Sequence, residues 1–272
     1  MTLRANIGEF FHRYLRMPYV LHTVEFQSPK RPRATYVFLH GIGNSLQAWS
    51  AVIEKLPPDV RIIGVDLLGF GKSPKPRWAV YDAKTQARSV GATLFSKRLV
   101  QQPILVGHSM GALVAIEVAR RYRLIPKELV LCSPPFYAPS SITDSKTWRT
   151  KDDVLKNIYH IARRHPEQLE KLSPLAVRLG LANKELSITK ENVEAYTAAL
   201  EACIINQNSL HDAALLQLPI TIFYGLFDPV VVKKHIVGLT KGSPFITTKR
   251  LNAGHEVMGS YATAVARFLN QE

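Results

Sequence analysis

The pentapeptide GHSMG at residues 107–111 holds a serine that could act as a nucleophile. It follows the apolar run PILV at 103–106 and precedes a helical pattern at 112–122. A G-x-S-x-G motif between a strand and a helix is typical of a nucleophile elbow, a turn so tight that glycine is needed two residues before and after the serine. We therefore expect Ser109 to lie in a strained turn at the end of a strand, the alternative being an ordinary strand-to-helix turn.

A serine hydroxyl is a weak nucleophile at neutral pH and needs an adjacent base, for which imidazole has a suitable pKa. Position separates the nine histidines of the chain. His255 follows the last predicted strand, at the sheet edge where Ser109 lies, and it is the predicted base. His40 is expected to brace backbone, and His108 is expected to point away from the serine that it precedes.

Such a base needs a carboxylate that fixes its tautomer and stabilises the imidazolium. Two aspartates follow predicted strands at this same edge, Asp228 before Pro229 and Asp66 before a glycine-rich turn. The glycines of that turn do not match a phosphate loop, because a third glycine and an immediate helix are missing. Position in the sheet alone leaves Asp66 as a competitor of Asp228.

Strand and helix patterns alternate along most of the chain, which predicts an α/β fold. The expected sheet is mostly parallel, of an eight-stranded type, with helices on both faces and its chemistry at the carboxyl ends of the strands. Strands are predicted at 19–26, 34–39, 60–65, 103–106, 127–132, 218–224 and 245–251. Helices are predicted at 3–15, 46–56, 85–101, 112–122, 231–239 and 261–269.

Residues 134–213 have a different character, with helical patterns and no convincing strand. We expect them to form an inserted helical lid over an α/β core made of residues 1–133 and 214–272, and such lids supply pocket walls and exclude water. Helices are predicted there at 152–164, 166–172, 174–181 and 190–205. Candidates for the pocket wall, each also compatible with ordinary packing, are Trp148, Tyr159, Tyr196 and Met258.

Five segments, taken in order, resemble the α/β-hydrolases of the capped, single-domain kind, and the resemblance runs from Tyr36 to Leu269. They are HGIG at 40–43, DLLGFGKS at 66–73, GHSMG at 107–111, YGLFDP at 224–229 and AGHE at 253–256. The resemblance implies an α/β-hydrolase fold and a serine hydrolase similar to carboxylesterases.

The resemblance also assigns the remaining site residues. The order Ser109, Asp228, His255 is the order that this fold uses. The turn after Asp66 resembles a structural loop of the family, and the other acid position known in relatives holds Ser133 here. The family pattern implies that the backbone amides of Ile42 and Met110 form the oxyanion hole.

The predicted function is cleavage of carboxylic esters with small to medium acyl chains through an acyl-enzyme intermediate, with no cofactor and no metal. Thioesterase, lactonase, acyltransferase and cofactor-free haloperoxidase activities stay open. A dehalogenase carries aspartate at the position of Ser109, and a carbon-carbon bond hydrolase usually carries tryptophan at the position of Glu256. A binding protein with this fold and little turnover is the alternative from another class.

The net charge of +14 over 272 residues is the one unusual feature of the composition. The basic residues are dispersed, without a long basic run interleaved with aromatics, so we expect a solvated surface and no nucleic-acid partner. The expected partner is a small-molecule ester, and the expected state is a monomer or homodimer. The two cysteines, Cys132 and Cys203, lack metal or disulfide spacing and are predicted to be buried.

The first residues predict a short amphipathic helix at 3–15 with a partly basic polar face. Packing of this helix on the main domain is the favoured expectation, and contact with a membrane surface is the alternative. Charged residues interrupt the segment, so it does not match a secretory signal, and a cytoplasmic location is expected.

Overall fold

The computed structural model of the chain describes residues 3–137, 161, 163–178 and 182–271. The helix expected at 152–164, and with it Tyr159, lies almost entirely outside these residues. Trp148, a candidate for the pocket wall, also lies outside them.

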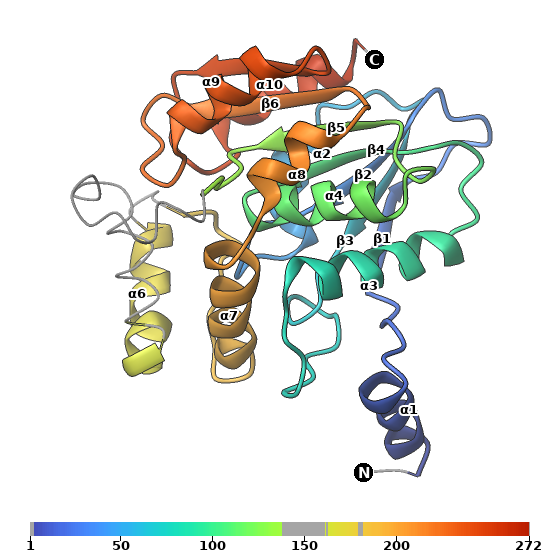
Figure 1. Ribbon diagram of the computed structural model, residues 1–272, viewed down its shortest axis with the longest axis vertical. Coiled ribbons are helices and arrows are strands. Elements are labelled where there is room, and N and C mark those ends of the chain that lie inside the picture. The colour runs from blue at the N-terminus through green and yellow to red at the C-terminus, as the bar shows by residue number, and fades with distance from the viewer. Residues whose placement is uncertain (1–2, 138–160, 162, 179–181, 272) are drawn as a thin grey trace.

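The described residues form one sheet of seven strands, in the spatial order β1-β3-β2-β4-β5-β6-β7 (Figure 1). β1 pairs antiparallel with β3, and all other neighbours are parallel. The strands are β1 (Thr23–Gln27), β2 (Thr35–Leu39), β3 (Arg61–Val65), β4 (Ile104–His108), β5 (Glu128–Cys132), β6 (Ile220–Gly225) and β7 (Ile246–Leu251). The expected mostly parallel sheet is confirmed, with seven strands here in place of eight.

The central strands are buried on both faces, which explains their continuous apolar sequences. Two separate hydrophobic clusters cover the sheet, one against each face. One cluster includes α3 (Ala83–Ser96), α4 (Met110–Arg121) and α9 (Lys233–Gly242). The other includes η1 (Leu46–Trp49), α2 (Ser50–Ile53) and α10 (Gly259–Leu269). Cys203 lies in the first cluster and Cys132 in the second, so both cysteines are buried as expected.

Between β5 and β6, the described residues form helices and loops, with no strand. It contains α6 (Pro166–Arg178), α7 (Val193–Ala199), the π-helical η3 (Leu200–Ile205) and α8 (Ser209–Leu215). The two helices expected at 166–172 and 174–181 are one helix with Pro174 inside it. Proline cannot bond the carbonyl of Glu170, and the hydroxyl of Ser173 donates to that carbonyl at 3.4 Å instead.

Helix α8 was not predicted from the sequence. It contacts α4 and α9, both of which belong to the α/β core. The expected boundary between lid and core, at 213–214, falls inside this helix.

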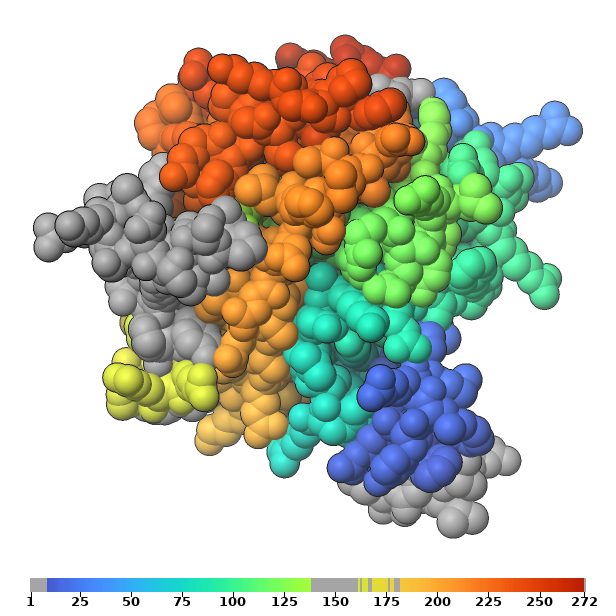
Figure 2. All heavy atoms as spheres, viewed as in Figure 1, coloured from blue at the N-terminus to red at the C-terminus, as the bar shows by residue number. Residues whose placement is uncertain are grey.

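Helix α1 (Leu3–Tyr14) stands out from the body of the molecule (Figures 1 and 2). The structure differs here from the favoured expectation of packing, because Phe10, Phe11 and Tyr14 are exposed to solvent. An amphipathic pattern shows which residues share a helix face, but it does not show what covers that face. None of the helices in the described ranges, α1 included, has the length and apolar content needed to cross a bilayer.

Candidate active site

Ser109 forms the turn between β4 and α4, with the unusual backbone angles φ 51° and ψ −117°. A Cβ atom on Gly107 would lie 2.5 Å from the carbonyl oxygen of Gly111, and one on Gly111 would lie 2.3 Å from that of Leu39. Both distances are far below van der Waals contact. The strained turn expected from GHSMG is therefore present, and its two glycines are required by close backbone approach.

The close approach at Gly111 gives a stability prediction. Gly111→Ala is expected to lower the free energy of unfolding by about 3 kcal/mol or more, because the added methyl group meets rigid backbone of β2. Gly238→Ala is the matched control, since Gly238 lies in α9. Apart from its chain neighbours and the backbone of its own helix, no described atom lies within 4 Å of the position of the added methyl group. The control should be neutral or more stable by up to about 1 kcal/mol. Urea unfolding of both variants measures the difference, and equal stabilities would contradict the prediction.

The structure brings Ser109, His255 and Asp228 together at the carboxyl edge of the sheet. The Nε2 atom of His255 lies 3.1 Å from the Oγ atom of Ser109. The Nδ1 atom of His255 lies 2.9 Å from Oδ2 of Asp228. Because the carboxylate accepts, the proton of the neutral imidazole is on Nδ1, and Nε2 is left to accept a proton from the serine hydroxyl.

Asp228 is held by the loop that follows β6. Its Oδ1 atom accepts hydrogen bonds from the amides of Val230, at 2.8 Å, and Val231, at 3.1 Å. Burial raises the pKa of Asp228, but the hydrogen bond and charge of His255, together with these amides, outweigh burial and lower it. The Asp228 side chain is therefore an ionised, fixed partner for His255.

The pKa of His255 is raised above its ordinary value. Burial lowers this pKa, but the hydrogen bond and charge of Asp228 and the charge of Glu256 raise it by more. A raised pKa means that the imidazolium is stabilised, and a base that must hold a proton during a reaction needs this property.

His108 contacts the backbone of His255. Its Nε2 atom donates to the carbonyl of His255 at 3.0 Å, and the two rings lie 5.0 Å apart. Burial is the main cause of the lowered pKa of His108. The ring does not bond Ser109, in line with the expectation, but its support of the His255 loop was not predicted from the sequence.

His40 braces backbone, as expected. Its Nδ1 atom donates to the carbonyl of Gly41 at 2.7 Å, and its Nε2 atom accepts from the amide of Leu67 at 2.9 Å. Burial lowers the pKa of His40, which keeps the ring neutral for these two roles. The bond to Leu67 joins the loop after β2 to the loop after β3.

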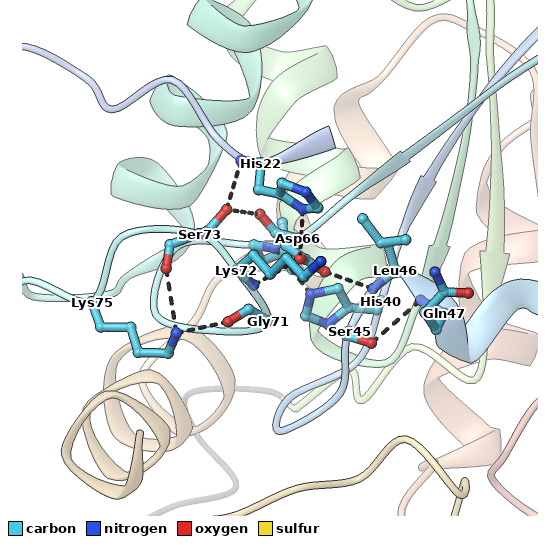
Figure 3. Close-up of polar contacts among 11 residues, drawn as sticks. His22, His40, Ser45, Leu46, Gln47, Asp66, Gly71, Lys72, Ser73 and Lys75 are labelled. Atoms are coloured by element: carbon cyan, nitrogen blue, oxygen red, sulfur yellow. Dashed lines mark hydrogen bonds and ion pairs between the residues drawn. The ribbon is translucent and has the colours of Figure 1, made fainter. Parts of the chain in front are cut away.

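Asp66 organises a neighbouring loop through hydrogen bonds to Leu46, Lys72 and His22 (Figure 3). Among the hydrogen bonds of the described residues, none joins Asp66 to His255. Its Oδ1 atom accepts from the amide of Leu46 at 2.8 Å. Its Oδ2 atom accepts from the amide of Lys72, at 2.8 Å, and lies 2.9 Å from Nδ1 of His22. The competitor for the acid position thus has a structural environment, as the resemblance implied.

A cavity of about 140 Å³ opens beside Ser109. Ile42 and His255 line it, whereas Met110 is fully buried as the first residue of α4. Among the described residues, the amides of Ile42 and Met110 donate to no backbone carbonyl. Tyr196 lines the cavity, as was considered from the sequence, and Met258 does not line it.

A sequence profile of the alpha/beta hydrolase fold matches residues 36–259, and the chain belongs to this family. A probable lysophospholipase, BODYGUARD 4 of Arabidopsis thaliana, is 34% identical over 120 residues, which are 43% of this chain and 28% of the relative. The uncharacterized hydrolase YugF of Bacillus subtilis is 32% identical over 149 residues, which are 50% of this chain and 54% of the relative. The chain thus matches only about a quarter of the length of the plant protein.

Solved structures show the same fold over nearly the whole chain. An esterase from Exiguobacterium antarcticum superposes with a TM-score of 0.76 at 17% identity, covering 94% of this chain and 98% of the esterase. The enol-lactonase of Burkholderia xenovorans superposes with a TM-score of 0.69 at 16% identity, covering 92% of this chain and 95% of the lactonase. At these identities the similarity is one of fold, and the expected α/β-hydrolase fold is confirmed.

Proposed function

We propose that this chain is a serine hydrolase that cleaves carboxylic esters of small to medium acyl chains through an acyl-enzyme intermediate. The observation that carries the proposal is the continuous hydrogen-bonded line from Ser109 through His255 to Asp228. The esterases, lactonase and probable lysophospholipases among the similar proteins support the class of reaction.

In the proposed first step, Nε2 of His255 takes the hydroxyl proton as Oγ of Ser109 attacks the ester carbonyl carbon. The resulting oxyanion is stabilised by the backbone amides of Ile42 and Met110, whose positions beside Ser109 fit this role. Loss of one such donor typically costs about 3 to 4 kcal/mol in the transition state. The imidazolium then protonates the departing alkoxide, and the acyl group stays on Ser109.

In the second step, His255 removes a proton from water, which attacks the acyl carbon and regenerates the serine hydroxyl. Asp228 holds the imidazole orientation throughout and stabilises the imidazolium in both steps. No other group needs to enter or leave, so the acid and the alcohol are the products.

We also propose that the expected lid, residues 134–213, caps the pocket up to the start of α8, and that α8 belongs with the core because it packs on α4 and α9. Five residues of this segment line the cavity beside Ser109: Pro135, Leu186, Tyr196, Leu200 and Ile204. The small volume of that cavity supports acyl chains of modest length.

A series of p-nitrophenyl esters, from acetate to laurate, tests the proposal. We expect saturable turnover with a maximum of kcat/KM at short or medium chains and a burst of p-nitrophenol. Thioester and lactone substrates form comparison arms. Preference for either of them over every ester would overturn the proposed substrate class, and no turnover in any arm would favour a binding protein.

The charge of Glu256 gives a pH prediction. Activity requires neutral His255, so it rises as pH increases through the pKa of this residue. Glu256→Gln removes one of the charges that raise this pKa, and the acid limb of kcat/KM is therefore expected to move to lower pH. Glu54→Gln, on the exposed surface, is the control and should leave the profile unchanged. A shift of the limb to higher pH in Glu256→Gln would contradict the prediction.

A further inference from the structure

An aromatic cluster on α1 is exposed to solvent. The ring of Phe10 lies 6.0 Å from that of Phe11 and 5.1 Å from that of Tyr14. Phe10 is 52% exposed and Tyr14 is 63% exposed. Tyr14 follows Phe10 by four residues and Phe11 by three, so its ring shares a helix face with each of them. The aromatic face of α1 is therefore uncovered, although burying it would be favourable.

The apolar surface continues beyond the helix. Leu15, Met17 and Val20 are exposed in the segment that joins α1 to β1. Single exposed apolar residues are common, but this row follows directly on the aromatic cluster in the sequence. We call these exposed residues the α1 apolar surface: Phe10, Phe11, Tyr14, Leu15, Met17 and Val20.

Positive charge accompanies the α1 apolar surface. Arg13 and Arg16 are exposed within the same stretch, and Lys84 is exposed at the start of α3. The Arg13 guanidinium lies 5.5 Å from the centre of the Tyr14 ring. The whole chain carries a net charge of +14. A partner of opposite charge is therefore favoured over a second copy of this basic surface.

The C-terminal end of α1 is attached to the rest of the protein, while its aromatic face is exposed. Nη2 of Arg88, in α3, donates to the carbonyl of Arg16 at 2.5 Å. The His12 ring stacks on that of Tyr19 at 3.7 Å. These contacts use the polar side of the helix and the turn after it, and they leave Phe10, Phe11 and Tyr14 outward.

We propose that α1 docks this protein on the surface of an anionic phospholipid bilayer. The aromatic cluster enters the boundary between headgroups and acyl chains, where rings with a polar tip such as Tyr14 are favoured. Arg13 and Arg16 pair with lipid phosphates, as basic residues of surface-bound amphipathic helices do. In Figure 1, α1 and α7 extend toward the same end of the molecule, so the bilayer would lie on the side of the proposed cap.

Vesicle sedimentation tests the proposal with the full chain. Vesicles of phosphatidylcholine and phosphatidylglycerol, in equal parts, are compared with vesicles of phosphatidylcholine alone. We expect at least about tenfold stronger binding to the anionic vesicles at low salt, with a loss on raising the salt concentration. The variants are Phe10→Ser with Tyr14→Ser, and Arg13→Glu with Arg16→Glu. Each pair should weaken binding to the anionic vesicles by about tenfold or more.

Phe95→Ser is the matched control, because Phe95 is an exposed aromatic residue outside α1, near the C-terminal end of α3. This control should bind as wild type does, and unchanged circular dichroism in all variants shows that they fold. Absence of binding to anionic vesicles, or binding that the α1 variants leave unchanged, would overturn the proposal. So would a dimer in solution that the Phe10 and Tyr14 changes dissociate while vesicle binding is absent.

Discussion

Ser109→Ala is expected to lower kcat toward p-nitrophenyl esters by about 10⁴- to 10⁶-fold, the range typical for loss of a triad nucleophile. The alanine has no hydroxyl to pass its proton to His255, so no acyl-enzyme forms. Binding of substrate should survive, because the cavity walls and the backbone amides are unchanged. Initial rates and burst amplitudes measure the effect directly.

Ser45→Ala serves as the control for this variant. Ser45 lies at the same sheet edge, where its Oγ accepts from the amide of Gln47 at the start of η1. Its replacement should cost about 1 kcal/mol of stability and leave kcat unchanged. Full ester turnover in Ser109→Ala would show that another group carries the reaction.

Asp228→Asn is expected to lower kcat by about 10⁴-fold without unfolding the protein. The amide can keep the Oδ1 contacts to Val230 and Val231, but it then presents an NH₂ group to Nδ1 of His255. Nδ1 must accept this bond, so the imidazole proton moves to Nε2, which can no longer take the proton of Ser109. A pH profile of kcat together with thermal unfolding distinguishes this effect from misfolding.

Asp66→Asn is the matched contrast, since Asp66 is also a buried aspartate after a parallel strand. Its contacts to Leu46, Lys72 and His22 hold loops together. We expect the variant to lose about 2 to 3 kcal/mol of stability, with no comparable loss of kcat in the folded protein. If Asp66→Asn lost more activity than Asp228→Asn, the assignment of the acid would be reversed.

The meeting of the three triad side chains could be anticipated from the sequence because it depends on topology. Parallel strands end at one edge, and Ser109, Asp228 and His255 each follow a strand. Choosing Asp228 over Asp66 required the family resemblance as well, because both aspartates satisfy the rule of the sheet edge. The structure separates them by their hydrogen bonds.

The support given by His108 could not be anticipated in this way. Its hydrogen bond reaches the carbonyl of His255, a residue 147 positions away in the sequence. Motif spacing places a residue on an element, but it does not show which backbone group its ring meets across the sheet edge. The one available signal was the position of His108 at the end of β4.

The helices are least predictable where local and tertiary signals compete. Pro174 suggested a break, yet α6 continues through it, since a nearby hydroxyl can bond the carbonyl that proline leaves free. The short helix α8 has only seven residues, too few for a clear period, and it is stabilised by packing on α4. In α1, by contrast, the helical period of the apolar residues was clear from the sequence. That period did not show whether another part of the molecule covers the apolar face.

Labelling with a fluorophosphonate, followed by mass spectrometry of the intact chain and its peptides, tests the central proposal most directly. We predict one adduct per folded chain, located on the peptide that contains Ser109, together with matching loss of esterase activity. The Ser109→Ala variant should take up no label. Absence of labelling in the folded protein, or an adduct on another residue that accounts for the lost activity, would contradict the account.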